Sequence, residues 1–261
     1  ATISNKGGGS INEYLLINEK NGGLQHIGGF NDEGLFVKEA PVSLIMPDSN
    51  GCQPCLASYI EGEYELLNAP FSLISSSAED SIYLSANESL SLQYVLYDNS
   101  GNELIKKIIT FDANNYSTQH EFYINSQKLN QKTNLELVWL NGLRPTEEKN
   151  SEDIQYSSGI ISQAEEMEDI QTNDPNKAIK RTVYNGNTDW VAIRSKYFIS
   201  SLISNNANSL FATLSAENVP FGQRKHTPLY SASIGFPFDQ KEILATLYLG
   251  PLDIDYITKT N

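Results

Sequence analysis

Two cysteines separated by two residues, Cys52 and Cys55, have the spacing that most directly suggests chemistry in this sequence. A CxxC motif that follows a strand and begins a helix is typical of thiol redox sites. Here the motif follows residues 47–51, which favour a turn, and no βαβ pattern surrounds it. A zinc site would need two further ligands, and no histidine lies nearby in the sequence. We favour a local disulfide or a free pair, and inert thiols or a redox or metal site are the alternatives.

The three histidines, His26, His120 and His226, are the other candidates for acid–base catalysis or metal binding. None of them belongs to a recognisable motif, so we predict packing or surface roles. The acidic residues at 147–148 and 165–169 occur in runs, which is typical of a solvated face rather than of carboxylates that face each other about 5–10 Å apart. There is no P-loop, dinucleotide fingerprint or nucleophile elbow. The sequence therefore predicts no catalytic residue, no metal site and no cofactor.

Composition excludes two classes of partner. The chain has 261 residues and a formal charge of −14, and it contains no cluster of Lys and Arg. Binding to nucleic acid or to anionic lipid headgroups requires such clusters. No stretch reaches the ~20 apolar residues that span a bilayer. The sequence begins without Met, as an excised part of a longer chain would.

Alternation of apolar and polar residues, the pattern of half-buried strands, recurs along the chain. Residues 89–97 place Leu90, Leu92, Tyr94 and Leu96 on one face, and residues 98–102 form a turn-rich link to the next strand. The predicted strands are residues 81–86, 89–97, 105–111, 116–125, 135–140, 209–215, 229–234 and 243–249. Short strands separated by Asn, Gly, Ser and Pro favour an all-β sandwich, and we expect one domain over residues 1–261.

Helical patterns are sparse. Residues 146–153 are charged and polar, which favours a loop over a packed helix. Residues 190–203 fit both a strand and a helix. Residues 252–258 follow Gly250-Pro251, which predicts a strand end and then a short helix.

Four stretches carry a family resemblance by their order and spacing. The first is residues 3–11 followed by 14–16, in which Gly7 and Gly8 form a Gly-rich turn between two strands. The second is residues 106–111 followed by Tyr116, the third is residues 190–192 with 196–198, and the fourth is residues 247–251. Together they resemble the large periplasmic domain of YidC-type (Oxa/Alb family) membrane protein insertases in the Bacteroidota-like form. The family's usual Ile-Pro after the third stretch is Ile203-Ser204 here, which leaves the local turn open.

The resemblance implies a β-supersandwich similar to galactose mutarotase, with a few short helices. It implies a location on the periplasmic face of the bacterial inner membrane, with transmembrane helices on both sides of the domain in the longer chain. It also implies a role as a non-enzymatic accessory domain. The partners that it implies are nascent membrane proteins and accessory subunits of the Sec translocon, bound by docking or transient contact. The positions that match the family motifs, with structural or interface roles, are Gly7, Gly8, Lys107, Phe111, Trp190, Lys196, Tyr197, Phe198, Gly250 and Pro251.

Two other functions remain open at this point. A secreted carbohydrate-binding or mutarotase-like sandwich protein would share the fold, but mutarotase chemistry needs a His acid and a Glu base at one sugar ring. An unrelated surface adhesin would share the strand pattern alone.

Overall fold

The computed structural model describes residues 1–20, 23–47, 51–74, 81–129, 132–172, 174 and 177–258. Its strands are β1 (Thr2–Ser4), β2 (Ser10–Glu13), β3 (Leu15–Leu16), β4 (Glu19–Lys20), β5 (Gly23–Leu24), β6 (Ile27–Phe30), β7 (Phe36–Ser43), β8 (Cys55–Ile60), β9 (Glu63–Leu66), β10 (Ser72–Leu73), β11 (Ser89–Tyr97), β12 (Glu103–Asp112), β13 (Ser117–Ile124), β14 (Leu135–Trp139), β15 (Ser158–Gln163), β16 (Glu166–Ile170), β17 (Ile179–Asn185), β18 (Trp190–Arg194), β19 (Phe198–Ser204), β20 (Phe211–Phe221), β21 (Arg224–Phe236) and β22 (Glu242–Pro251). Its helices are α1 (Ser126–Leu129), α2 (Asn150–Tyr156) and α3 (Ile254–Ile257). No helix in the described ranges is long and apolar enough to cross a bilayer.

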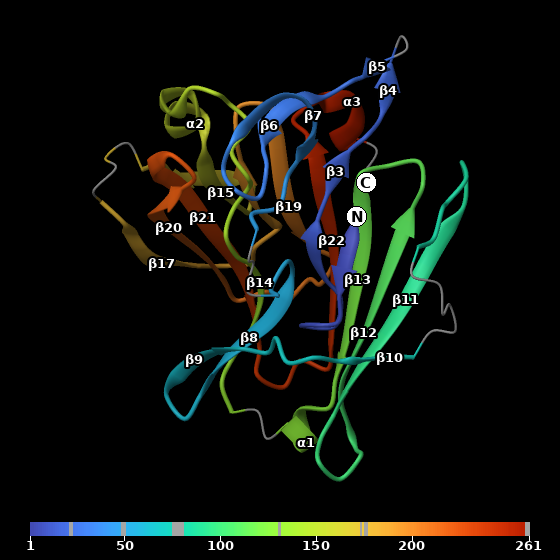
Figure 1. The fold of residues 1–261 in the computed structure, drawn as a ribbon. Helices are drawn as coiled ribbons and strands as arrows, with labels where there is room; N and C mark the ends of the chain where they lie inside the picture. Colours follow the sequence, from blue (N-terminus) through green and yellow to red (C-terminus); the bar gives the residue numbers. More distant parts are fainter. Residues whose placement is uncertain are drawn as a thin grey trace.

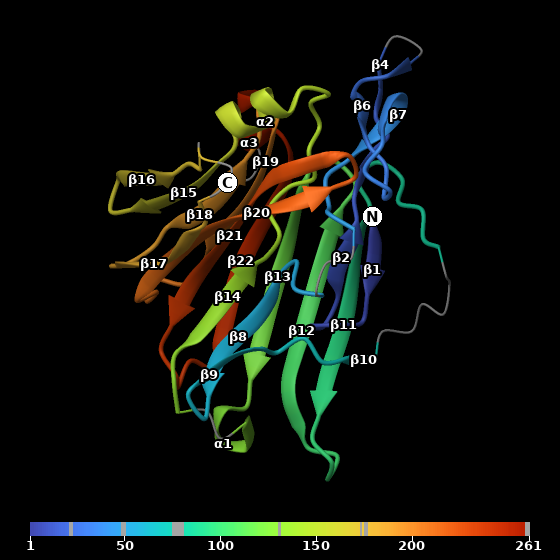
Figure 2. The same cartoon turned by 60° about the vertical axis from the view of Figure 1, so that its left-hand side comes forward.

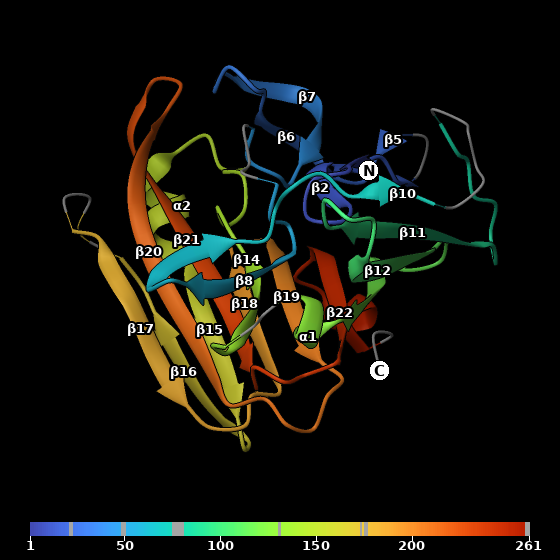
Figure 3. The same ribbon diagram turned by 90° about the horizontal axis from the view of Figure 1, so that it is seen from below.

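Two large antiparallel sheets form the body of the molecule (Figure 1). The nine-stranded sheet has the order β10-β11-β12-β13-β22-β19-β18-β15-β16, and the six-stranded sheet has the order β17-β20-β21-β14-β8-β9. Viewed from below, the nine-stranded sheet passes from β16 through β22 to β11, with β17, β20 and β21 beside its first half (Figure 3). The expected all-β sandwich with a few short helices is therefore confirmed.

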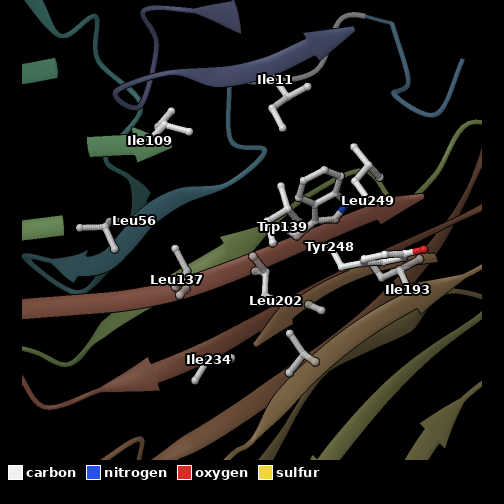
Figure 4. Packing of buried hydrophobic residues seen from close by; sticks show 14 of the residues in the cluster. Ile11, Leu56, Ile109, Leu137, Trp139, Ile193, Leu202, Ile234, Tyr248 and Leu249 are labelled. Carbon is white, nitrogen blue, oxygen red and sulfur yellow. The ribbon is translucent and has the colours of Figure 1, made fainter. Parts of the chain in front are cut away.

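The core lies between these sheets because the alternating strands turn their apolar faces toward one another. Ile109 of β12, Leu137 and Trp139 of β14, and Leu202 of β19 are all almost fully buried in one cluster. Figure 4 shows these side chains together with Ile11, which the N-terminal hairpin contributes to the same core. The first hairpin is thus part of the sandwich packing.

Small elements gather at one end of the sandwich. The sheet β3-β7-β6, the β4–β5 hairpin, α2 and α3 lie at the upper end in Figures 1 and 2, and α1 lies at the opposite end. Arg144, which is buried, attaches the small sheet: its guanidinium donates to the backbone oxygens of Ile45 at 2.6 Å and Phe30 at 3.1 Å, and it pairs with Asp32 at 2.7 Å.

Most predicted strands are present, and several are longer than predicted. Residues 89–97 coincide with β11, and residues 105–111, 229–234 and 243–249 lie within β12, β21 and β22. Residues 116–125 contain β13, residues 135–140 contain β14, and residues 209–215 overlap the start of β20. The ambiguous residues 190–203 form the antiparallel pair β18 and β19, which continues through Ser204.

The strand predicted at residues 81–86 is wrong. This segment is extended or turning and pairs with no described strand, and Tyr83 is 93% exposed. The chain turns at residues 85–88, where the N–H of Glu88 donates to the oxygen of Ser85 at 3.0 Å. Alternation alone cannot make a strand without a neighbouring edge to bond.

The loop predicted at residues 146–153 is also wrong in its second half. Helix α2 begins at Asn150, and its Asp153 is 2% exposed. Asp153 is buried because Arg224 of β21 reaches it, a contact across 71 residues that no local pattern reveals. The predicted short helix after Pro251 is α3, whose N-cap Asp253 accepts from the N–H of Asp255.

Candidate functional site

The residues that match the family motifs fall into two groups in space, with two residues outside them. The first group surrounds Lys107 of β12, and we call it the lysine junction: Gly7, Gly8, Lys107 and the Cys52–Cys55 loop. The Nζ atom of Lys107 donates to the backbone oxygen of Pro54 at 2.9 Å and to that of Gly7 at 3.3 Å. It also lies 4.8 Å from the ring centre of Phe122. One fully buried amine therefore joins the first hairpin, the cysteine loop and the nine-stranded sheet.

The cysteine loop is closed by a disulfide between Cys52 and Cys55, both fully buried. Gln53 anchors this loop: its backbone N–H donates to Ser10 Oγ at 2.8 Å, and its side-chain amide donates to the oxygen of Leu140 at 3.1 Å. Bonds to the first hairpin and to the chain after β14 place the loop between them. The disulfide, one of the two states favoured for this pair, lies in a packed position rather than at the surface.

The turn of the first hairpin explains its glycines. Gly7, Gly8 and Gly9 have φ of +56°, +71° and +95°, a region that L side chains rarely adopt. A Cβ on Gly8 would lie 2.9 Å from the Phe71 ring and 3.0 Å from the Lys107 side chain. Glycine is therefore required twice, by the backbone conformation and by the close approach of the lysine.

His120 of β13 lies near Lys107 in this buried layer. The side chain is fully buried, and its Nε2 lies 2.8 Å from Thr118 Oγ1. Burial, and secondarily the nearby Lys107, hold the pKa of His120 well below its usual value. Burial likewise lowers the pKa of Lys107 to about 7. A neutral lysine amine is a potential nucleophile, but this one is 0% exposed and donates to two carbonyl oxygens, so no substrate reaches it.

The second group is the turn between β18 and β19 together with the end of β22. Lys196 in this turn pairs with Glu152 at 2.6 Å and Glu147 at 3.3 Å, and these carboxylates raise its pKa. Its Nζ lies 4.7 Å from the ring centre of Tyr197, which is 53% exposed.

The end of β22 packs against the turn between β18 and β19 and forms the other half of this second group. Phe198 is paired with Pro251 across the strands, and the N–H of Leu252 donates to the oxygen of Tyr197 at 2.7 Å. A Cβ on Gly250 would lie 2.7 Å from the Tyr116 ring, so glycine is required by packing there.

Arg224 and Asp153 form a buried ion pair beside this second group. Their atoms are 2.5 Å apart, and the side chains are 8% and 3% exposed. Burial raises the pKa of Asp153 to about 6 in spite of Arg224. The guanidinium also lies 4.2 Å from the centre of the Phe30 ring. This pair connects α2, β21 and the small upper sheet.

We predict that Arg224→Met lowers the free energy of unfolding by about 2 kcal/mol at pH 7, measured by urea denaturation. The buried Asp153 loses its cation, although protonation of its carboxyl limits the cost. Lys225→Met is the matched control, because Lys225 is exposed and should change stability by less than about 0.5 kcal/mol. Equal effects of both substitutions would contradict the role of the pair.

Two motif residues lie outside both groups. Phe111 is half-buried on β12 and lines a groove of about 530 Å³ together with Leu90 and Ile3. Trp190 is half-buried at the start of β18, opposite Ile203. A second, more polar hollow of about 450 Å³ lies between β12, β13 and α1.

The histidines do not form a site together. His120 is in the core, and His226 lies on β21. The ring centre of His26 lies 5.5 Å from that of Phe198, in an edge-to-face arrangement. Within the described ranges no three His, Cys, Asp or Glu side chains are grouped as a metal site would require.

Sequence reasoning missed the partners of the motif lysines. Glu147 belongs to an acidic run typical of a solvated face, and Glu152, the other partner of Lys196, belongs to a charged segment that favours a loop. The burial of Asp153 with Arg224 and of His120 was missed for the same reason, because their neighbours in sequence are polar. The signal in the sequence was the period of two, which puts His120 on the same face of β13 as the apolar Phe122. The structure pairs Phe122 with Lys107 on β12. Their burial follows from the second sheet, which the register alone does not show.

Comparison with known proteins agrees with this architecture. The solved structure of alpha-N-acetylgalactosaminidase NagBb from Bifidobacterium bifidum matches 89% of this chain and 36% of its own, with a TM-score of 0.50 and 11% identity, a likeness of fold alone. The membrane protein insertase YidC of Chlorobium phaeovibrioides is 25% identical over 98% of this chain. The chain spans 41% of that insertase.

The family model of the YidC periplasmic domain matches residues 60–261, which is most of the chain. The match covers the second group, Lys107 and Phe111, and the N-terminal hairpin lies before it. The chain therefore belongs to the family of YidC periplasmic domains, which places it on the periplasmic side of the inner membrane.

Proposed function

We propose that this domain makes transient contact with segments of membrane proteins during insertion and is mechanically coupled to the membrane part of its insertase through β22 and α3. Docking to accessory subunits of the Sec translocon is a further part of the proposal, taken from the family resemblance. The observation that carries the proposal is the position of β22. This strand lies between β13 and β19 in the nine-stranded sheet and leads directly into α3.

Several contacts make this connection firm. Tyr248 Oη donates to the oxygen of Pro251 at 2.7 Å, and the N–H of Leu252 donates to Tyr197. The ring of Tyr256 in α3 lies 5.1 Å from that of Tyr116, edge to face. Motion of the sheet is therefore transmitted to α3 without a flexible joint.

A pair of insertions tests the coupling. A short Gly-Ser linker between Leu252 and Asp253 should reduce insertion of a membrane protein by about ten-fold, because it uncouples α3 from the sheet. The same linker after Ser100, in the exposed turn between β11 and β12, is the control and should change insertion by less than about two-fold.

The measurement is protease protection of an inserted substrate in cells that depend on an insertase carrying this domain. Two equally harmless insertions would overturn the coupling. Co-purification of the two variants with Sec accessory subunits tests docking separately. If both variants keep their binding to these subunits, docking does not depend on the connection between β22 and α3.

A further inference from the structure

A small internal cavity lies beside the buried ion pair of Arg224 and Asp153, where α2, β18 and β21 meet. Its volume is about 10 Å³, and the apolar side chains of Leu143, Ile193 and Pro228 form part of its wall. A cavity of roughly 10–15 Å³ is the smallest that holds a water molecule. The occupant that fits this cavity is therefore one water or an ion of similar size.

Three buried polar atoms belong to side chains that line the cavity. They are Asp153 Oδ1, Arg194 Nε and Thr227 Oγ1, and none of them has a hydrogen-bond partner within the described part of the chain. Asp153 and Thr227 are 2% and 1% exposed, so bulk solvent does not reach these two side chains. A buried polar group destabilises a fold unless something bonds to it. Three such atoms around one cavity indicate a shared ligand.

The known contacts of these side chains leave the three atoms available. The second carboxylate oxygen of Asp153, Oδ2, pairs with Arg224. The backbone N–H of Thr146 faces the same carboxylate but does not reach hydrogen-bonding geometry with Oδ1. Asp153 and Arg194 are both described, and no direct ion pair joins them. Polar groups that line one cavity without touching are commonly joined by a water molecule.

The donor and acceptor chemistry selects water over an ion. The Nε–H group of Arg194 can only donate, the ionised carboxylate of Asp153 can only accept, and the hydroxyl of Thr227 can do both. A water that accepts from Arg194 and donates to Asp153 and Thr227 makes three hydrogen bonds, the typical number for a buried water. A cation would lie against the guanidinium of Arg194, and an anion would lie against the carboxylate of Asp153.

We propose that one ordered water molecule occupies this cavity and bridges Asp153, Arg194 and Thr227. It joins α2 to β18 and β21, and hence to both large sheets. Arg194 ends β18 directly before the turn that contains Lys196, and Glu152, a partner of Lys196, lies on α2 beside Asp153. The water therefore holds the base of this turn against the helix that carries its ion-pair partner. This inference goes beyond the proposed function and does not depend on it.

A crystal structure of the 261-residue chain tests the proposal directly. At a resolution of about 1.5 Å, one density peak should lie roughly 2.7–3.2 Å from each of the three atoms. Direct bonds between the three side chains, or a cavity without density, would overturn the proposal. A peak with contacts of about 2.4 Å, as a metal ion makes with oxygen, would overturn it as well.

Thr227→Val tests the water through the sign of a stability change. Valine has nearly the shape of threonine but no hydroxyl. If the water is present, valine removes one of its hydrogen bonds, and the equilibrium constant for folding should fall about ten-fold. If no water is present, valine removes a buried hydroxyl without a partner, and the constant should rise or stay unchanged, which would overturn the proposal. Urea denaturation at pH 7 measures the change, because Asp153 has a pKa of about 6 and is ionised there.

Thr213→Val on the neighbouring strand β20 is the matched comparison. The Oγ1 atom of Thr213 is also buried, and it lies 2.7 Å from Ser233 Oγ in a direct hydrogen bond. Its replacement should lower the folding constant about ten-fold whether or not the cavity holds a water. A similar fall in both variants supports the water, whereas a fall for Thr213→Val alone contradicts it. If Thr227→Val does not fold, the crystal structure of the wild type still decides the question.

Discussion

Lys107→Met is expected to lower the free energy of unfolding by about 4 kcal/mol at pH 7, because it leaves the buried backbone oxygens of Gly7 and Pro54 without a donor. Methionine has a similar length and remains apolar, so the loss is of hydrogen bonds rather than of volume. Urea denaturation with the disulfide intact measures the change. Lys106→Met is the matched control: the side chain of this adjacent residue is on the other face of β12, and we expect a change below about 0.5 kcal/mol.

The same substitution should change the dependence of stability on pH. The pKa of Lys107 is about 7 in the folded chain and near 10.5 when the chain unfolds. Between these values the unfolded chain binds a proton that the folded chain does not, so the stability of the wild type rises with pH by at most about 1.4 kcal/mol per unit from this group. The destabilisation by Lys107→Met should therefore grow from pH 7 to pH 9. A constant difference would contradict a neutral buried lysine.

Gly8→Ala is expected to lower the free energy of unfolding by about 3 kcal/mol. Alanine is strained at a φ of +71°, and its Cβ would lie 2.9 Å from the Phe71 ring and 3.0 Å from Lys107. Gly101→Ala is the control, since Gly101 has a φ of +81° but no atom within 4 Å of an added Cβ.

Gly101→Ala should lower the free energy of unfolding by about 1 kcal/mol, which is the cost of the backbone strain alone. Thermal and urea unfolding of the two variants separate backbone strain from packing at the lysine junction. If the two substitutions cost the same, close packing of the first hairpin against Lys107 does not contribute.

The strands were predictable because one face of most strands is apolar and buried and the other face is polar. In β11 the alternation of Leu90, Leu92 and Tyr94 with polar residues matches a strand with one buried face, and the bounds agree with the structure. Residues 81–86 have a similar pattern but fail, since a strand also needs a partner edge. Local patterns therefore indicate which residues favour extension, whereas pairing depends on the whole sheet.

The sites could be predicted only in part, for a topological reason. Lys107 could be named from a motif, but its partners Gly7 and Pro54 are 100 and 53 residues away. Likewise, Asp153 appears in a polar run until β21 brings Arg224 to it. Because β13 pairs with β22 across more than a hundred residues, single-sequence periodicity carries no information on such contacts.

The central position of β22 has a mechanical consequence. Its hydrogen bonds to β13 and to β19 run perpendicular to the strand, so tension applied through α3 loads both ladders in shear. In shear the bonds of both ladders share the load, whereas an edge strand peeled from its end loses them one by one. A domain held through β22 therefore resists extension more strongly than one held through an edge strand would.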